Sequence, residues 1–190
     1  LTGFTQTNGI EVVDGTGAAG TVRLLGDWKA NTLDFRAATF VGSNIVVDGA
    51  DGNDKILGTA GGDVIVGGGG ADILTGGAGA DIFVFGAVKQ SSNKGKGGGI
   101  DTITDFAVGS DVIRLSDAVF TALAGMPGLA ADAFVIGKAA ADAADRIVYD
   151  AATGKLFYDE DGVGGAEQTL FAKLAAGLAL TSASFEIITA

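Results

Sequence analysis

Residues 49–84 read GADGNDKIL GTAGGDVIV GGGGADILT GGAGADIFV, which is four nonapeptides without a gap. Glycine occupies the first and fourth positions of every nonapeptide, and the eighth position is always apolar. The sixth position is always aspartate: Asp54, Asp63, Asp72 and Asp81. Because glycine loses more conformational freedom on folding than any other residue, a stretch this rich in glycine needs something besides the chain itself to order it.

Each nonapeptide is typical of a six-residue turn followed by a three-residue strand whose middle side chain points inward. The inward side chains are those of Ile56, Ile65, Leu74 and Phe83. One inward residue per strand makes a thin core, so we expect successive strands to coil into a parallel solenoid with two nonapeptides per coil. The turns of alternate nonapeptides then share a side, which places Asp54 beside Asp72 and Asp63 beside Asp81.

Carboxylates stacked at strand spacing repel one another unless a cation lies between them. The glycine-rich turns can supply backbone carbonyl oxygens to the same cation. A site made only of oxygen atoms suits calcium, which accepts six to eight oxygen ligands in loose geometry, whereas magnesium prefers a small octahedron and keeps its waters. The pattern therefore predicts that calcium orders the turns.

The four nonapeptides resemble the Gly-Gly-x-Gly-x-Asp-x-apolar-x repeat of the RTX (repeats-in-toxin) calcium-binding proteins. The second position departs from this pattern in two repeats, where Ala50 and Thr59 replace glycine. The resemblance implies that carbonyls at positions two and four of one turn, and at positions one and three of the turn two repeats on, bind each ion together with both aspartates. One implied set is Asp54 and Asp72 with the carbonyls of Ala50, Gly52, Gly67 and Gly69. The other is Asp63 and Asp81 with the carbonyls of Thr59, Gly61, Gly76 and Ala78.

Further ions could be held in half-sites formed by the turns at either end of the repeats. The candidate ligands there are Gly49, Asp51, Gly58, Ala60, Gly68, Gly70, Gly77 and Gly79. Asp101, which opens the next predicted strand, is either a further calcium ligand or the cap of that strand.

Other interpretations of the glycine-rich stretch fit less well. A dinucleotide or phosphate loop needs glycines that open a long helix, but here each turn is followed by another turn. An EF-hand fails because DGADGNDKILG, from Asp48, lacks a glutamate at the twelfth position. A glycine solenoid without metal stays open as an alternative, although it leaves the aspartate period unexplained.

Composition limits the function further. The 190 residues include 33 Gly and carry a net charge of -11, which argues against nucleic acid or an anionic membrane as partner and favours cations. The absence of His and Cys excludes a histidine zinc site, a Ser-His-Asp triad, a thiol nucleophile and disulfides. No small-molecule substrate is indicated. An opening Leu1-Thr2-Gly3 without a start Met suggests a piece of a longer protein.

The flanks divide the chain into three predicted parts. Residues 1–48 contain strand-like runs without the aspartate, as expected of irregular rungs that cap the roll, followed by the roll at 49–86. Residues 87–190 form a β-rich cap, with strands in IDTITDF and SDVIRL, a hairpin in RIVYDAATGKLFYDEDG, and last strands in TLFAKL and SFEII. The predicted fold class is therefore all-β, a right-handed parallel β-roll (β-solenoid) with irregular amino-terminal capping rungs and a β-rich carboxyl-terminal cap.

The Asp-Phe-x-x-Gly-x-Asp-x-Ile-x-Leu pattern at residues 105–115 and the residues after it resemble the terminal domain of serralysin-type and other type I secreted proteins. This resemblance implies an uncleaved secretion signal in the last several dozen residues, where Glu186-Ile187-Ile188 fits the usual acidic and apolar ending. It implies export by a bacterial type I ABC transporter to the medium or the cell surface. An ordinary edge strand remains the alternative for these residues.

Two function classes follow. The first is a non-catalytic calcium-binding module that folds outside the cell and supports secretion, as the carboxyl end of a larger surface protein such as an adhesin. The second is the same module attached to an extracellular protease, lipase or epimerase, whose catalytic part would lie upstream because this chain has no Gly-x-Ser-x-Gly and no His. A carboxylate enzyme within this chain is a third option, weakened because the repeated aspartates already have a role.

Overall fold

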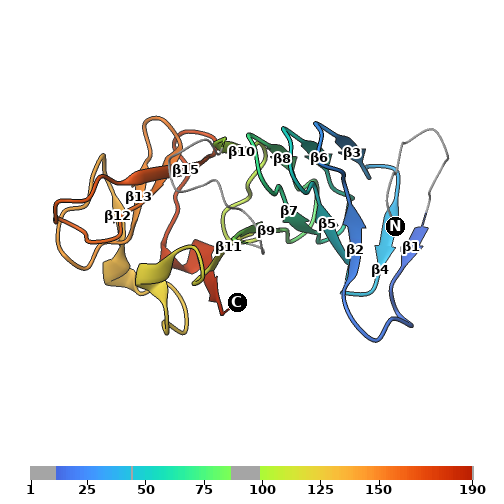
Figure 1. The fold of residues 1–190 in the computed structure, drawn as a ribbon, viewed down its shortest axis with the longest axis horizontal. Helices are drawn as coiled ribbons and strands as arrows, with labels where there is room; N and C mark the ends of the chain where they lie inside the picture. Colours follow the sequence, from blue (N-terminus) through green and yellow to red (C-terminus); the bar gives the residue numbers. More distant parts are fainter. Residues whose placement is uncertain (1–11, 44, 87–98, 190) are drawn as a thin grey trace.

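Two long β-sheets face each other in the computed structural model, which describes residues 12–43, 45–86 and 99–189 (Figure 1). The first sheet has eight strands in the order β12-β13-β14-β15-β10-β8-β6-β3, and the second has six in the order β16-β11-β9-β7-β5-β2. Consecutive strands of the roll alternate between the two sheets, so the chain winds as a solenoid. The all-β roll expected from the sequence is confirmed.

The four nonapeptides form β6 (Lys55–Leu57), β7 (Val64–Val66), β8 (Ile73–Thr75) and β9 (Ile82–Phe85). β6 pairs with β8 in parallel, with Ile56 opposite Leu74. β7 pairs with β9, with Ile65 opposite Phe83. Paired residues therefore lie two nonapeptides apart, which confirms the predicted coil.

Both sheets continue beyond the four repeats. Upstream, β3 (Thr32–Asp34) pairs with β6, and β2 (Val22–Leu25) pairs with β5 (Ile45–Asp48), which pairs with β7. Downstream, β10 (Asp101–Ile103) pairs with β8, and β11 (Val112–Ser116) pairs with β9. The division into parts at 48/49 and 86/87 stays a prediction, and sheet pairing crosses both boundaries.

A column of inward side chains fills the space between the sheets. The four inward residues of the repeats are at most 1% exposed, and the inward residues of the flanking strands are at most 4% exposed. These flanking members include Leu24, Leu33, Val47, Ile103 and Ile113. Each coil contributes one apolar residue from each sheet, so stacking the coils buries a continuous core that no single coil could form.

The roll ends at the amino side in a small parallel sheet of β1 (Val12–Asp14) and β4 (Thr39–Val41). The rings of Phe35 and Phe40 pack edge to face here, with centroids 5.3 Å apart. Among the described residues, no helix has the length and apolar character needed to cross a membrane.

The carboxyl cap extends the eight-stranded sheet with β12 (Phe134–Ile136), β13 (Ile147–Asp150), β14 (Lys155–Tyr158) and β15 (Thr169–Lys173). β13 and β14 form the predicted antiparallel hairpin, with Tyr149 opposite Leu156 and a turn that ends at Gly154 (φ 75°). Short 3₁₀ helices at Thr121–Leu123, Ala131–Ala133 and Ser182–Ser184 join the strands. β16 (Phe185–Ile188) forms an edge of the six-stranded sheet beside β11.

Candidate metal centre

The aspartates of alternate repeats meet, as the sequence predicts. The backbone N–H of Asp54 donates to Oδ1 of Asp72 over 2.8 Å. The N–H of Asp63 donates to Oδ1 of Asp81 over 2.9 Å. Each carboxylate thus binds the backbone of the coil before it, and we call this series of contacts the aspartate ladder.

The ladder continues to Asp101. The N–H of Asp72 donates to Oδ1 of Asp101 over 3.0 Å, and β10 follows directly in register with β8. Asp101 therefore occupies the sixth position of a further coil. It stands 29 residues after Asp72, whereas the repeats are 18 residues apart, so the extra chain lies between the strands.

Two members of the ladder were missed in the sequence. Asp111 accepts the N–H of Asp81 over 3.0 Å, and Asn31 donates its own N–H to Oδ1 of Asp54 over 2.7 Å. Their signals were partial: Gly109, Asp111 and Ile113 keep the spacing of positions four, six and eight. Residues 26–34 keep glycine first and leucine eighth, with asparagine at the position of the aspartate.

Four of the ladder carboxylates have one oxygen without a partner. Oδ2 of Asp54, Asp72, Asp81 and Asp101 is buried and accepts no hydrogen bond, although these residues are at most 2% exposed. A buried carboxylate oxygen without a donor is costly. Four such oxygens in one ladder indicate a place for a cation.

Burial raises the pKa of these carboxyl groups. It raises the pKa of Asp54 to about 7, with a further contribution from the charge of Asp72, and that of Asp81 to about 6. Burial also raises the pKa of Asp63, and it raises the pKa of Asp72 and Asp101, which face each other. Without a cation, the folded protein therefore holds its carboxylates at a cost near neutral pH.

First-position glycines leave room for these oxygens. A Cβ on Gly49 would lie 2.4 Å from Oδ2 of Asp54 and 2.4 Å from the carbonyl oxygen of Gly67. Gly58 shows the same arrangement, with Oδ2 of Asp63 and a carbonyl oxygen of the turn two repeats on within 2.5 Å. In both cases Oδ2 of the aspartate and the first carbonyl of the turn two repeats on face the same spot, which no side chain can fill.

In three of the four turns, the residues at the second and fourth positions of the nonapeptide have positive φ and lie in the left-handed backbone region. In the first turn, Ala50 has φ 72° and Gly52 has φ 124°. In the third and fourth turns, the glycines at these positions have φ between 101° and 130°. Their neighbours are carbonyls: a Cβ on Gly68 would lie 1.7 Å from the oxygen of Ala50. The carbonyls of successive turns are therefore stacked closely, as a shared oxygen site requires.

The first and third turns are also joined by their backbones. The N–H of Gly69 donates to the carbonyl of Ala50, and the N–H of Gly52 donates to the carbonyl of Gly69, each over 2.7 Å. A carbonyl oxygen has a second lone pair, so these bonds leave one acceptor site on each oxygen. The predicted first ligand set is brought together in this pair of turns.

The second turn differs from the others because Thr59 replaces glycine. The N–H of Thr59 donates to Oδ2 of Asp63 over 2.6 Å, and its hydroxyl lies 3.1 Å from the same oxygen. Gly61 in turn donates its N–H to the threonine hydroxyl over 3.0 Å. This turn satisfies its own carboxylate, so the predicted second set is less open than the first.

The fourth turn is held from outside the repeats. Asp105 accepts the N–H groups of Gly76 and Gly77, each over 2.9 Å, and the hydroxyl of Ser110 donates to the carbonyl of Gly79 over 2.8 Å. The sequence did not predict these contacts, because the 30 residues between Asp81 and Asp111 conceal the register of this coil with the fourth turn.

The donor set fits calcium. No three acidic side chains converge on one point within the described ranges, so backbone carbonyls must supply most of the ligands. A set of hard oxygens from two carboxylates and several carbonyls, on glycine turns that adapt their geometry, suits calcium better than a small octahedral ion. The role of each predicted ligand, including Ala60, Gly70 and Ala78, stays a prediction.

Facing parallel sheets built from glycine-aspartate nonapeptides define a β-roll of the RTX type. The chain matches the model of the family described as Peptidase M10 serralysin C terminal over residues 11–154 and belongs to that family. A comparison with curated proteins found no match.

Solved structures share this fold. The solution structure of the R2 subunit of AlgE6 mannuronan C5-epimerase from Azotobacter vinelandii aligns with a TM-score of 0.50 and 22% identity, over 95% of this chain and 94% of that chain. The R3 subunit of the same enzyme aligns with a TM-score of 0.45 and 22% identity, over 95% of this chain and 81% of that chain. The R2 similarity shows a common β-roll fold.

Proposed function

We propose that this chain is a calcium-binding folding module of a secreted protein and has no catalytic role of its own. The observation that carries the proposal is the set of buried Oδ2 atoms in the aspartate ladder that have no hydrogen-bond partner. A cation beside them would remove both the repulsion and the desolvation cost. Membership of the serralysin C-terminal family supports the choice of calcium.

The first site would use Asp54 and Asp72 with carbonyls of the first and third turns. Those turns are already stacked, and both of these aspartates have an unpartnered oxygen. The second site would use Asp63 and Asp81. Asp101 would extend the first series, since its Oδ2 is also unpartnered.

Calcium binding at these sites would be coupled to folding, because the turns that supply the ligands exist only in the roll. Each site filled at about 100 times its dissociation constant contributes about 2.7 kcal/mol, so two sites supply a large fraction of the stability of an ordinary domain. Extracellular calcium modules bind with dissociation constants of roughly 10⁻⁴ to 10⁻³ M. Sites of that strength would be empty inside a cell and filled outside it.

The test is unfolding by urea, followed by far-UV circular dichroism, in calcium, in magnesium and with a chelator. We expect calcium to raise the unfolding midpoint strongly, magnesium to do so weakly, and the chelator to remove most of the β signal at neutral pH. A spectrum and midpoint that the chelator leaves unchanged would exclude the proposal.

Support for type I secretion is a further part of the proposal. Glu186 lies in the edge strand β16, where it forms an ion pair with Arg114 over 2.7 Å. The carboxyl-terminal segment is therefore part of the folded sheet, so a transporter could recognise it only before the chain folds. Deletion of the last several dozen residues from the full-length protein should abolish secretion and leave synthesis intact. Fusion of residues 100–190 to an unfolded passenger should export it when the matching transporter is present, and normal secretion of the truncated protein would contradict this role.

A second candidate function is the same module at the end of a secreted enzyme, which the peptidase name of the family favours over an adhesin. The two differ only in what lies upstream of this chain. Sandwich repeats in tandem there would indicate an adhesin, and a catalytic motif would indicate an enzyme.

A further inference from the structure

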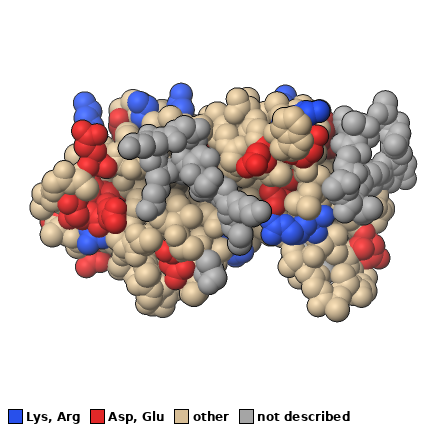
Figure 2. Space-filling view, viewed as in Figure 1, with Lys and Arg blue, Asp and Glu red and all other residues tan. Residues whose placement is uncertain are grey.

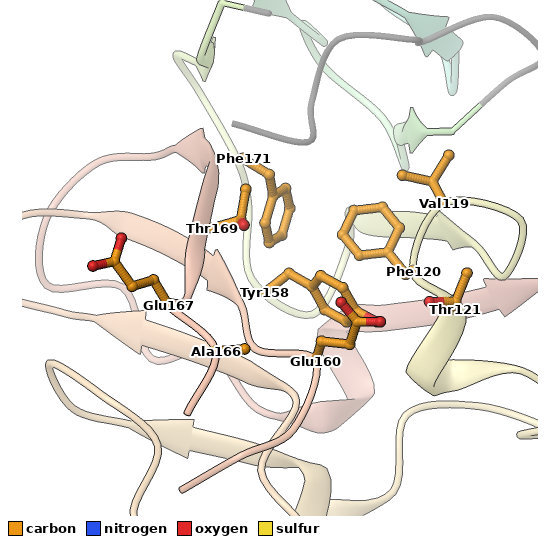
Figure 3. Close-up of a pocket in the computed structure, with 9 residues that line it drawn as sticks. All are labelled: Val119, Phe120, Thr121, Tyr158, Glu160, Ala166, Glu167, Thr169 and Phe171. Carbon is orange, nitrogen blue, oxygen red and sulfur yellow. The ribbon is translucent and has the colours of Figure 1, made fainter. Parts of the chain in front are cut away.

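The carboxyl cap contains a cavity of about 220 Å³ that shares no residue with the aspartate ladder. It lies between the ends of β14 and β15 and the segment that opens the first 3₁₀ helix (Figure 3). Pockets for drug-sized ligands have volumes of roughly 300–1,000 Å³, so the occupant of this cavity must be compact.

Three aromatic rings form the apolar wall of the cavity. Phe120 packs edge to face against Tyr158 and Phe171, with centroids 5.1 and 5.2 Å away. Phe120 and Phe171 are at most 2% exposed, so their positions are fixed by the core. The hydroxyl of Tyr158 accepts the N–H of Ala122 over 2.7 Å, which holds this ring in place. The cavity is therefore preformed.

The mouth of the cavity is acidic. Figure 3 shows the carboxylate of Glu160 and the side chain of Thr121 around the same opening as the ring of Tyr158. Within the described part of the chain, Glu160 forms no side-chain hydrogen bond or ion pair, and no Lys or Arg lines the cavity. On the face seen in Figure 2, acidic side chains gather at the end of the molecule formed by β12–β15. Glu167 also lines the rim, but its carboxylate points away from the rings in Figure 3.

We propose that this cavity binds a compact organic cation, an alkylammonium or guanidinium group on a short apolar stem. The stem would lie against the partly exposed side chains of Val119 and Tyr158, with the buried rings behind them. The charge would lie between Glu160 and the ring of Tyr158, where a carboxylate and an aromatic face both attract a cation. An anion is disfavoured by the free carboxylates. A sugar is disfavoured because Phe120 and Phe171 present no open ring face on which it could stack.

The test uses n-butylammonium as probe, with butan-1-ol and butyrate as the neutral and anionic analogues, in calcium-saturated protein. The backbone amide of Ala122 is the reporter in ¹H–¹⁵N NMR spectra, because its hydrogen bond ends on the wall of the cavity. We expect saturable shifts at this amide with butylammonium and none with butyrate. Equal binding of butan-1-ol would show an apolar slot without cation selectivity and would overturn the proposal.

Substitutions of the two rim glutamates test whether Glu160 is the carboxylate that contacts the bound cation. Glu160→Gln should weaken butylammonium binding by about two- to fivefold, whereas the matched Glu167→Gln, with the same change in net charge at the same rim, should have a smaller effect. Tyr158→Phe should retain binding, because the hydroxyl is already engaged. Equal weakening by both glutamate variants would show that binding depends on the net charge of the rim and not on Glu160, and would overturn the proposal.

A last comparison separates two sources of the cation. Binding of N-acetyl-lysine amide with the same dependence on Glu160 would support a protein side chain as the natural occupant. Binding of butylammonium alone would support a small free amine. Binding of neither probe would overturn the proposal.

Discussion

Lowering the pH from about 8 to about 5 is expected to stabilise the calcium-free protein and to weaken the effect of calcium. The group that dominates this prediction is Asp54, whose pKa burial raises from 3.8 to about 7. The folded state then binds its proton more tightly than the unfolded state does. This contribution to stability is fully present below about pH 4 and is lost as the pH rises through about 7.

The magnitude follows from the size of the shift. A shift of about three pKa units corresponds to about 4 kcal/mol, which the calcium-free fold loses when Asp54 ionises. Asp81, with a pKa of about 6, adds about 3 kcal/mol to the same change. Only the part above pH 5 falls within the tested range, about two pKa units for Asp54 and about one for Asp81, so the expected change between pH 5 and pH 8 is about 4 kcal/mol. This is a large fraction of the total stability of a typical domain, about 5–15 kcal/mol. The calcium-free roll should therefore be marginal at pH 8 and folded at pH 5.

The assay is urea unfolding at four pH values in calcium-free buffer and in saturating calcium. Asp54→Asn is the informative variant, because it removes the proton-binding group and keeps an oxygen that can accept the N–H of Asn31. It should flatten the pH dependence of the calcium-free protein, stabilise it at pH 8 and weaken calcium binding. The reasoning is wrong if the calcium-free protein becomes more stable as the pH rises from 5 to 8, or if the variant leaves the slope unchanged.

Three shorter predictions follow from the same geometry. Asp72→Ala should show strong non-additivity in calcium affinity with Asp54→Ala and little with Asp63→Ala, measured by calorimetric titration of single and double variants. Thr59→Gly should raise the calcium affinity of the second site, because it removes the hydroxyl that bonds to the carboxylate of Asp63 and leaves only the backbone N–H on Oδ2, and it should cost the calcium-free fold about 1 kcal/mol in lost hydrogen bonds. Gly68→Ala should destabilise the roll by about 2 kcal/mol or more, because φ is 101° and the new Cβ would overlap a carbonyl of the neighbouring turn.

Each of these has a contrary outcome. Additive effects of the first pair would refute the shared ion and the assignment of the sites. An unchanged affinity in Thr59→Gly would show that the threonine does not compete with calcium. Gly165→Ala is the control for the glycine variant, since its Cβ would meet nothing within 4 Å, and equal effects of the two substitutions would refute the steric argument.

The sequence predicted the roll because its repeats have one length. Once the period was seen, the pairing of Ile56 with Leu74 and of Asp54 with Asp72 followed from the number of residues per coil. The coils at either side obey the same register, but their lengths are 23, 29 and 30 residues. A search for a fixed period cannot find them, because insertions in the turns change the spacing without changing the strand contacts.

The hydrogen bonds that distinguish one turn from another also could not be predicted from the sequence. A threonine in place of glycine was visible at position 59, but its hydrogen bonds to Asp63 depend on a backbone conformation that no motif specifies. The aromatic cavity in the cap brings together residues 119–121 and 158–171, which are joined only by tertiary packing. Local patterns fix the strands, whereas such sites depend on where separate strands end.

The distribution of unpartnered oxygens along the roll has a physical explanation. Five ladder aspartates use Oδ1 to accept a backbone N–H of the previous coil, so asparagine could serve that purpose equally well; they are Asp54, Asp72, Asp81, Asp101 and Asp111. Asn31 stands at the amino end of one series, and its side chain bonds within its own turn, to the N–H and the carboxylate of Asp27. At the carboxyl end of the other series, Asp111 has both oxygens satisfied, by the N–H groups of Asp81 and Ala107. For the aspartates with an unpartnered Oδ2, the ladder bond alone therefore does not explain why the residue is aspartate and not asparagine. A divalent cation would require the second carboxylate oxygen.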